Sequence, residues 1–489
     1  MDGLLDGIFL LPFRSGYMLR TKIICTLGPA SRSPDTILKL VQGGMNLARL
    51  NMSHGEQEDH RAVIGFIRDA AAQVGQPVGI MVDLSGPKIR VGELGTSIEL
   101  KKGKAVVVAP YDKVQPGEIP CSYRLLSREL QPGDTLLLDD GLLELRCIGT
   151  EGDRTELEVV RGGLLKARKG INLPGVTLTA PSLTEKDLSD LEFALEEGVE
   201  YVALSFVRGP EDVIDIKKRV GDQALVIAKI EKAEALRTIE EILPETDAVM
   251  VARGDLGVEL PFERVPLAQK RIIEMANLYA RPVITATQML ESMLEHARPT
   301  RAEASDVANA ILDGTDALML SGETAVGRYP REALEALINI GTEIERSGFL
   351  VRGPQYLTHP GMDSRGGASS QEHAVAAATV DAVRRVNAPA IVVITRSGFS
   401  ARLVSSYRPA VPVFAVTTDR ATYRQLSMVW GVQPVLAENI EVSYNSLTAF
   451  GLESVLSSGV GEAGAVIPVT AGYPFHQSGS TNTMRLEHL

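Results

Sequence analysis

Eight short apolar runs, most of them followed by an amphipathic helical pattern, constrain what residues 19–350 can fold into. The runs lie at 21–27, 45–51, 78–84, 201–206, 224–231, 248–255, 282–289 and 317–323, with helical patterns for example at 34–42 and 188–197. Continuous apolar runs of this length are typical of buried parallel strands, which need crossover connections such as helices. An open, doubly wound sheet could show the same alternation. The count of eight favours an α/β fold with a closed (β/α)8 TIM barrel.

Two further segments do not continue the repeating pattern of the barrel. Residues 87–181 show β-branched alternation and turn signals such as Pro116-Gly117 and Pro132-Gly133, which indicate an inserted all-β domain. An insertion at the C-terminal face of a barrel would form a lid over the site. A loose stretch rich in Gly, Ser, Pro and His ends near residue 370, and strands are expected beyond it at 388–394, 411–416 and 465–469. We therefore predict an N-terminal extension (1–18), the barrel (19–86 and 182–350), the lid (87–181), a linker (351–370) and a C-terminal α/β domain (371–489).

The charge balance and the cysteines limit the class of protein. The 50 basic and 62 acidic residues give a net charge of -12, which argues against a general nucleic-acid binder. The three cysteines form no CxxC pair, as in proteins of reducing compartments. No apolar run is as long as a membrane span, and Asp2, Asp6 and Pro12 interrupt the apolar N-terminus, so neither a membrane protein nor a signal peptide is expected. We expect a soluble cytoplasmic protein.

Charged residues stand at the ends of several predicted strands. Lys229 and Glu231 end the fifth run, and Asp255 ends the sixth. Such groups are costly to bury unless they have a partner, and a lone carboxylate at a strand end is more often a helix cap or half of an ion pair. Here further polar groups end other strands of the same barrel: Arg49, Asn51, Ser53, Asp83, Thr287, Ser321 and Glu323. Glu231 and Asp255 could together hold Mg2+ or Mn2+, while Lys229 and Arg49 face an anionic phosphorylated substrate.

Several long motifs resemble the pyruvate kinase family. They are TKIICTLGPAS at 21–31, NLARLNMSHG at 46–55, KGINLPG at 169–175, ALVIAKIEKAEAL at 224–236, MVARGDLG at 250–257, ATQMLES at 286–292, RPTRAE at 298–303 and MLSGET at 319–324. The resemblance runs from about residue 19 to the C-terminus. It implies a barrel, an inserted β lid and a C-terminal α/β regulatory domain. It also implies phosphoryl transfer from phosphoenolpyruvate to ADP, which gives pyruvate and ATP.

The resemblance further implies a role for each matching residue. Glu231 and Asp255 would hold the divalent ion, and a second ion would arrive with the nucleotide. Gly254, Asp255 and Thr287 would receive the substrate carboxylate, and Arg49, Lys229 and Arg90 the phosphoryl group. Thr287 and Ser321, acting through water, are candidates for protonating the enolate, and His54, Lys169 and Arg90 lie on the nucleotide side. The family is usually a homotetramer.

One departure from the family pattern concerns K+. Many members hold K+ at positions matching Asn51, Ser53, Asp83 and the carbonyl of residue 84, and carry a glutamate where this chain has Lys88 and a threonine where it has Leu84. The Lys88 ammonium could supply the charge that K+ otherwise brings, as in the K+-independent branch of the family. The alternative is that Lys88 points to solvent, as most lysines do.

A loop in the C-terminal domain has the composition of a phosphate site. Thr395, Arg396, Ser397, Gly398 and Ser400 lie between a strand and a helix, where hydroxyls and free N–H groups can bind phosphate or simply cap the helix. The family places an allosteric site there. The facing loop, 470–483, has no Lys or Arg, so we expect activation by a sugar monophosphate or AMP rather than by fructose 1,6-bisphosphate.

Two other functions stay open on the residues alone. The chain could be a different metal-dependent barrel enzyme acting on phosphoenolpyruvate or pyruvate, although such an enzyme gives no reason for the lid. It could also be a non-catalytic, metabolite-binding regulator, against which the intact set of charged residues argues.

Overall fold

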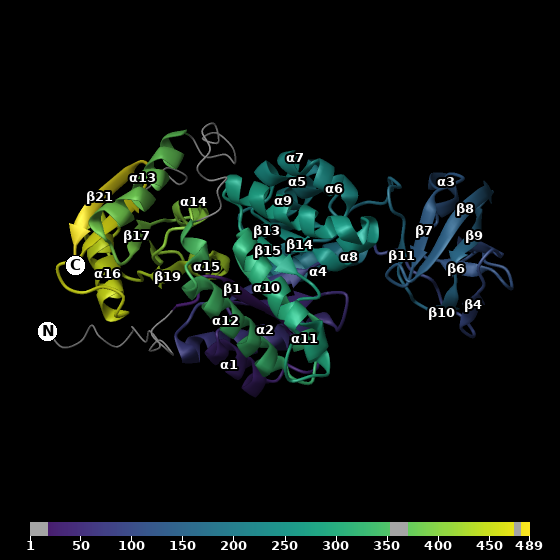
Figure 1. Ribbon diagram of the computed structural model, residues 1–489, viewed down its shortest axis with the longest axis horizontal. Helices are drawn as coiled ribbons and strands as arrows, with labels where there is room; N and C mark the ends of the chain where they lie inside the picture. Colours follow the sequence, from purple (N-terminus) through teal and green to yellow (C-terminus); the bar gives the residue numbers. More distant parts are fainter. Residues whose placement is uncertain (1–17, 353–369, 474–480) are drawn as a thin grey trace.

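The computed structural model describes residues 18–352, 370–473 and 481–489. The predicted N-terminal extension and linker lie almost wholly outside these ranges. Three bodies follow one another along the molecule, with the barrel between the inserted β domain and the C-terminal domain (Figure 1). Among the described residues, no helix is both long enough and apolar enough to cross a membrane.

Eight parallel strands close into a barrel in the order β1-β16-β15-β14-β13-β12-β3-β2. Their bounds are β1 Lys22–Thr26, β2 Leu47–Asn51, β3 Gly79–Asp83, β12 Tyr201–Leu204, β13 Leu225–Ile230, β14 Ala248–Ala252, β15 Val283–Ala286 and β16 Ala317–Leu320. The strands are buried on both sides, because alternate side chains point to two different cores. One core fills the barrel and includes Ile24, Met81, Ile227 and Met250. The other lies between the strands and the surrounding helices, and the predicted TIM barrel is confirmed.

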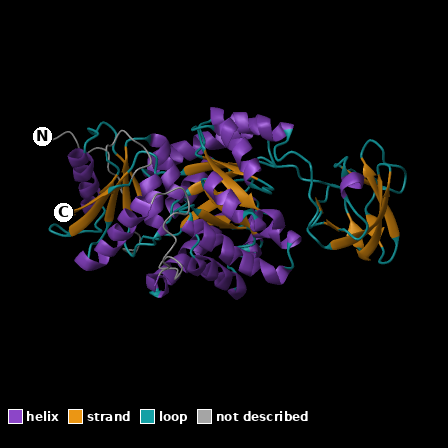
Figure 2. Ribbon diagram, turned by 90° about the horizontal axis from the view of Figure 1, so that it is seen from above, coloured by secondary structure: helices purple, strands orange, loops and turns teal. Residues whose placement is uncertain are grey.

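Helices surround the strands (Figure 2). They are α1 Pro34–Gly43, α2 Gln57–Val74, α4 Glu185–Glu196, α5 Pro210–Val220, α6 Ala233–Arg237, α7 Ile239–Glu245, α8 Arg253–Glu259, α9 Val265–Leu278, α10 Arg301–Asp313, α11 Gly322–Ala325 and α12 Pro330–Arg346. Local sequence sets several of their ends. Ser33 caps α1 ahead of Pro34, and Gly44 ends it in a left-handed conformation with φ 110°. Thr184 and Asp187 form a capping box at the start of α4.

The strands predicted at 248–255, 282–289 and 317–323 are shorter than expected. β14 ends at Ala252 and α8 starts at Arg253, so Asp255 lies in the first turn of a helix. β15 ends at Ala286, and the next two residues, Thr287 and Gln288, have positive φ angles. A left-handed conformation cannot continue a strand, whatever the apolar pattern suggests.

The inserted domain is entirely separate from the barrel sheet. A six-stranded sheet has the order β11-β7-β8-β9-β5-β6, and β10 pairs with β4 in a second, two-stranded sheet. The elements are β4 Ile98–Leu100, β5 Ala105–Pro110, β6 Ile119–Cys121, α3 Leu126–Glu129, β7 Thr135–Leu138, β8 Leu143–Glu151, β9 Arg154–Arg161, β10 Gly163–Leu165 and β11 Ile171–Asn172. It has its own apolar core and stands clear of the barrel at the end of two chain connections (Figure 1).

The C-terminal domain is a five-stranded sheet in the order β19-β18-β17-β20-β21, with β21 antiparallel. Its elements are α13 Ser370–Val386, β17 Ile391–Ile394, α14 Phe399–Ser406, β18 Val413–Thr417, α15 Arg420–Gln425, β19 Val432–Leu436, α16 Tyr444–Ser457, β20 Val466–Ala471 and β21 Thr483–His488. The three predicted strands are β17, β18 and β20. The two edge strands, β19 and β21, were not predicted, because β19 contains Pro434 and β21 is half exposed, so neither shows a continuous apolar run.

The C-terminal domain closes the N-terminal end of the barrel. Met428 belongs to the apolar cluster that fills the barrel interior. The Tyr201 hydroxyl donates to the carbonyl of Gln425 over 2.6 Å, and Arg408 pairs with Asp316 at 2.9 Å. The lid is attached at the opposite end, through the chain that leaves β3 after Asp83 and returns to α4. The C-terminal ends of the barrel strands therefore face the lid.

Candidate active site

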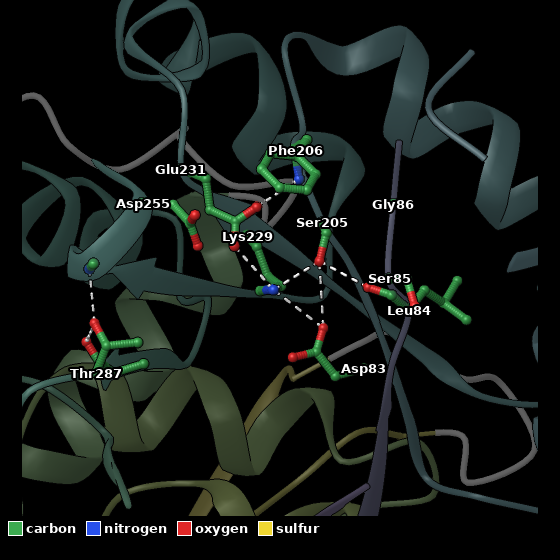
Figure 3. A network of polar contacts seen from close by, with 12 residues as sticks. Asp83, Leu84, Ser85, Gly86, Ser205, Phe206, Lys229, Glu231, Asp255 and Thr287 are labelled. Atoms are coloured by element: carbon green, nitrogen blue, oxygen red, sulfur yellow. Dashed lines mark hydrogen bonds and ion pairs between the residues drawn. The ribbon is translucent and has the colours of Figure 1, made fainter. Parts of the chain in front are cut away.

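A buried network of charges lies at the lid end of the barrel (Figure 3). The Lys229 Nζ atom, near the end of β13, lies 2.9 Å from Glu231 Oε1 and 3.2 Å from Asp83 Oδ1. It also donates to Ser205 Oγ over 2.7 Å. Arg49, at the middle of β2, donates to Asp83 Oδ2 through Nε (2.8 Å) and Nη2 (2.6 Å). Strands β2, β3 and β13, together with Ser205 after β12, thus bring two cations and two carboxylates together.

The pKa values show how strongly these charges are coupled. Burial alone would lower the pKa of Lys229, but Asp83 and Glu231 outweigh it and raise that pKa well above its ordinary value. Burial would raise the pKa of Asp83, and the cations of Lys229 and Arg49 instead hold it below its ordinary value. Lys229 therefore stays an ammonium and Asp83 a carboxylate. The network therefore holds the Lys229 ammonium at a fixed place at the base of the site.

Glu231 and Asp255 form the part of the site that could hold a metal. Burial raises the pKa of Glu231, the Lys229 ammonium opposes that rise, and the charge of Asp255 adds to it. Two mutually repelling carboxylates fit a divalent cation, since hard cations take carboxylate oxygens together with oxygens of the substrate. No group of three or more His, Cys, Asp or Glu side chains suited to a metal occurs in the described parts of the chain. A cation here would therefore depend on substrate or water for its remaining ligands.

Thr287 lies across the site from Glu231 (Figure 3). It follows β15 with φ 68°, and its hydroxyl accepts the N–H of Gly254 over 2.8 Å. The Gly254 N–H, expected to receive the substrate carboxylate, is thus already bonded to Thr287. The Arg253 guanidinium donates to the carbonyls of Thr287 and Gln288 and pairs with Asp306 at 2.7 Å. Arg253 holds the turn that presents Thr287.

Ser321 has an unusual position at the end of β16. Its Oγ atom is buried and has no hydrogen-bond partner in the described structure. Its N–H donates to Glu323 Oε2 over 2.8 Å, and the other oxygen of Glu323 accepts the N–H of Leu290. Glu323, fully buried, is therefore structural, whereas the Ser321 hydroxyl is left for a water or a substrate.

The residues of the expected monovalent-cation site form hydrogen bonds with one another and with neighbouring serines. Asn51 Oδ1 accepts the N–H of Ser53, whose hydroxyl donates to Ser85 over 3.2 Å. The carbonyl of Leu84 accepts the Ser205 hydroxyl over 2.8 Å. Lys88 does not simply point to solvent. Its Nζ is 3.9 Å from Asp255 Oδ1, and a third of its side chain is exposed. Its ammonium therefore faces the edge of the carboxylate pair.

The residues expected on the nucleotide side are divided between the barrel and the lid. The Arg90 side chain donates to the carbonyl of Arg168, and Lys169 pairs with Asp139 at 2.7 Å, both within the lid. His54 follows β2, and its carbonyl contacts His60 Nε2 at 2.9 Å. With the lid in this orientation, Arg90 and Lys169 are held by lid residues and not by the charge network of the barrel.

The predicted phosphate loop is a tight turn ahead of α14. The Thr395 hydroxyl accepts the N–H of Gly398, which has φ 76°, and Ser400 Oγ lies 2.6 Å from Thr481 Oγ1. The Arg396 carbonyl accepts the Thr422 hydroxyl, and Ser397 lies in the same turn. Half of the facing loop, residues 474–480, lies outside the described residues. A Cβ placed on Gly398 would be 2.9 Å from Arg402 Nη1, so a cation that the sequence reasoning missed lies directly over this loop.

Three further residues of the site escaped the sequence reasoning. Ser205 links Lys229 to the β3 end, Phe206 donates its N–H to Glu231 Oε2 over 2.7 Å, and Arg253 fixes Thr287. Ser205 and Phe206 are the last two residues of the fourth apolar run and follow β12, so a strand-end search could have included them. Arg253 lies within a quoted motif, but Thr287 and Asp306, which it contacts, are more than thirty residues away in the chain.

The chain is similar to known proteins over both its barrel and its C-terminal domain. The family described as "Pyruvate kinase, barrel domain" matches residues 18–334, and "Pyruvate kinase, alpha/beta domain" matches residues 373–487. The chain is 42% identical over 478 residues to a pyruvate kinase of Geobacillus stearothermophilus, covering 96% of this chain and 80% of the relative. Pyruvate kinases of Bacillus licheniformis and Staphylococcus aureus (strain MRSA252) are also 42% identical, with the same coverage. The chain therefore belongs to the pyruvate kinase family and is a phosphotransferase.

Proposed function

We propose that this chain transfers a phosphoryl group from phosphoenolpyruvate to ADP and gives pyruvate and ATP. The observation that carries the proposal is the buried Lys229 ammonium, fixed between Asp83 and Glu231 at the lid end of the barrel. Phosphoryl transfer needs mainly positioning and stabilisation of charge, which a preorganised cation provides. Lys229 would face the transferring phosphoryl group and the oxygen it leaves, while Arg49 holds Asp83 in place and offers its outer N–H groups to the phosphoryl oxygens.

Glu231 and Asp255 would hold Mg2+ or Mn2+, and a second divalent ion would arrive with the nucleotide. When bound, such an ion supplies charge neutralisation at the substrate oxygens. The two carboxylates repel each other, and the described residues offer no third acidic ligand beside them. Both observations support a site that the substrate completes. Thr287 and the N-terminal turn of α8 would orient the substrate carboxylate.

Ser321 would deliver the proton that converts the enolate to pyruvate, relayed through water. The support for this role is its buried hydroxyl, which has no partner in the described structure. A serine hydroxyl is too weak an acid to donate the proton unaided, so a water chain to bulk solvent must restore it.

Two regulatory properties belong to the proposal. Lys88 would make the enzyme independent of K+, supported by its ammonium beside Asp255. A sugar monophosphate or AMP would bind at Thr395, Arg396, Ser397, Gly398 and Ser400, supported by the left-handed Gly398 at the start of α14.

A homotetramer is also proposed, supported by the highly exposed Phe262 and Leu267 near the start of α9.

A coupled assay tests the main proposal. Pyruvate formation should require phosphoenolpyruvate, ADP and Mg2+ together. Binding of Mn2+ alone, followed by electron paramagnetic resonance, should weaken in Glu231→Gln. A folded protein that forms no pyruvate under these conditions would favour the metabolite-binding alternative, and one that consumes phosphoenolpyruvate without ADP would favour another barrel enzyme.

A further inference from the structure

The turn at residues 206–208 contacts both connections between the barrel and the lid. On the first connection, a Cβ placed on Gly86 would lie 2.8 Å from Phe206 Cδ2 and 3.0 Å from Ser205 Cβ. The chain therefore runs directly across the Phe206 ring, and Figure 3 shows it passing beside Ser205. The Gly86 N–H is fixed from the other side by Asp187 Oδ1 at 3.1 Å.

Arg208 contacts the second connection. Its Nη1 atom donates to the carbonyls of Leu178 (2.6 Å) and Ala180 (2.9 Å), just before the chain re-enters the barrel. Asp212, one turn along α5, accepts from Nε (3.2 Å) and Nη2 (3.0 Å). One guanidinium thus joins a rigid barrel helix to the returning lid connection, in a geometry that a fork of five donors allows.

The lid holds the residue between those two carbonyls. Glu129, on α3 of the lid, accepts from the N–H of Thr179 (3.1 Å) and from its hydroxyl (2.5 Å). The other oxygen of Glu129 accepts the Tyr123 hydroxyl over 2.7 Å. Thr179 is therefore fixed to the lid while its neighbours on both sides are fixed to Arg208. A change in lid angle must pass through this three-residue segment.

The same turn also holds Glu231. Phe206 donates its N–H to Glu231 Oε2 over 2.7 Å, and it does so with φ 56°. A bulky residue occupies the left-handed region only when its surroundings hold it there, and here Gly86 of the first lid connection packs against the ring while Glu231 accepts the N–H. Beside it lies a cavity lined by both connections and the barrel, including Pro87, Ile89, Leu178, Phe206 and Arg208. Incomplete packing at this point gives the connections room to shift.

We propose that Arg208 is a positioning residue that couples the orientation of the lid to the orientation of Glu231, and thereby sets the affinity of the site for its divalent cation. The coupling passes from the second lid connection to Arg208, through the 206–208 turn to the Phe206 N–H, and then to Glu231 Oε2. It rests on the proposed function in one respect, namely that Glu231 holds the cation.

The test is the dissociation constant of Mn2+ alone for the full-length protein, followed by electron paramagnetic resonance, together with the Mn2+ dependence of kcat. Arg208→Met releases the second lid connection from the turn, whose main chain stays bonded to Asp212, and the dissociation constant should rise roughly tenfold, the lower end of what outer-sphere partners of a metal site contribute. Arg219→Met is the matched control. Arg219 pairs with Asp215 at i,i+4 spacing on α5, the helix that carries Asp212, and its side chain is half exposed. It should leave Mn2+ binding unchanged.

A purely structural role for Arg208 would lower the melting temperature without changing the Mn2+ dissociation constant, and that result would overturn the proposal. If Arg208→Met does not fold, Asp212→Asn loosens the same guanidinium with a smaller change and should weaken Mn2+ binding several-fold; unchanged binding in that variant also overturns it. Glu231→Gln distinguishes failure of the metal assignment from failure of the coupling. If it leaves Mn2+ binding intact, the metal assignment itself fails, whereas weakened binding in Glu231→Gln and normal binding in Arg208→Met defeats only the coupling.

Discussion

Arg253 donates through Nη2 to the main-chain carbonyl of Thr287 over 2.7 Å and so holds that residue at φ 68°. Arg253 opens α8 and Thr287 follows β15, so the contact joins the ends of two neighbouring strands. The Thr287 hydroxyl in turn accepts the N–H of Gly254, directly after Arg253. The two residues form a closed unit that fixes the wall of the site opposite Glu231.

Arg253→Lys should disturb this wall without removing the charge. A lysine cannot reproduce the fork that contacts Thr287, Gln288 and Asp306 together, so the turn should relax. We expect kcat/KM for phosphoenolpyruvate to fall about 10²-fold, as for a displacement of about 1 Å in a catalytic group. Steady-state kinetics measure this, with the exposed Arg271→Lys on α9 as control. Unchanged kinetics in a folded variant would show that Thr287 keeps its position without Arg253.

Lys229→Met should affect both catalysis and stability. It removes the cation at the base of the site and leaves Asp83 and Glu231 buried with one partner fewer. We expect kcat to fall on the order of 10²–10³-fold or more, and the free energy of unfolding to fall by about 3–5 kcal/mol. Activity assays and urea unfolding measure the two effects. Lys229→Arg keeps the charge and should recover much of the stability but not the rate.

Lys88→Glu should make the activity respond to K+. The substitution removes the ammonium 3.9 Å from Asp255 and adds a carboxylate, which a monovalent cation can then neutralise. Activity should be measured with K+ and with a tetraalkylammonium salt at equal ionic strength. Strong activation of the unmodified enzyme by K+ would refute the assigned role of Lys88.

The C-terminal loop should respond more strongly to a monophosphate than to a bisphosphate. Titrations with glucose 6-phosphate, ribose 5-phosphate, AMP and fructose 1,6-bisphosphate, at phosphoenolpyruvate below its KM, compare them directly. Arg402→Met removes the guanidinium above Gly398 and should raise the activation constant of the effective monophosphate about tenfold, the order expected for one charge-assisted contact. A stronger response to fructose 1,6-bisphosphate would contradict the predicted effector class.

Lys22, between the barrel and the C-terminal domain, should make stability rise with pH. Burial lowers the pKa of Lys22 to about 8, a drop that the nearby Glu345 partly opposes. Its Nζ donates to the carbonyl of Val432 over 2.7 Å. Below pH 8 the lysine is charged in both the folded and unfolded states. Between pH 8 and about 10.5 the unfolded chain keeps the proton that the folded protein loses, so the free energy of unfolding rises with pH, by up to about 3 kcal/mol.

Lys22→Met should lose this rise. Urea unfolding at pH 7, 8, 9 and 10 gives the difference in free energy between the variant and the original protein, with the exposed Lys39→Met as control. That difference should shift in favour of the original protein as the pH increases. A difference independent of pH would mean that Lys22 does not titrate in this window.

The strand pattern alone was enough to predict the barrel, the inserted domain and the C-terminal domain, because buried parallel strands show as apolar runs of limited length. It failed at edge strands β19 and β21, which are only half buried and so carry a weak pattern. It also placed Asp255 at the end of a strand, where the chain has already turned into α8. Strand ends depend on tertiary contacts that an apolar pattern does not record.

By itself, the sequence determined which chemical groups the site contains. Glu231, Asp255 and Thr287 follow barrel strands, Lys229 lies near the end of β13 and Arg49 lies within β2, and a closed parallel barrel gathers such positions at one face. Only the tertiary structure decided how those groups are paired. Asp83 shares Lys229 with Glu231, Lys88 lies beside Asp255, and Arg208 joins the lid to the turn that orients Glu231. These pairings link residues far apart in the chain, and short-range patterns of hydrophobicity and charge hold no information about distances of that kind.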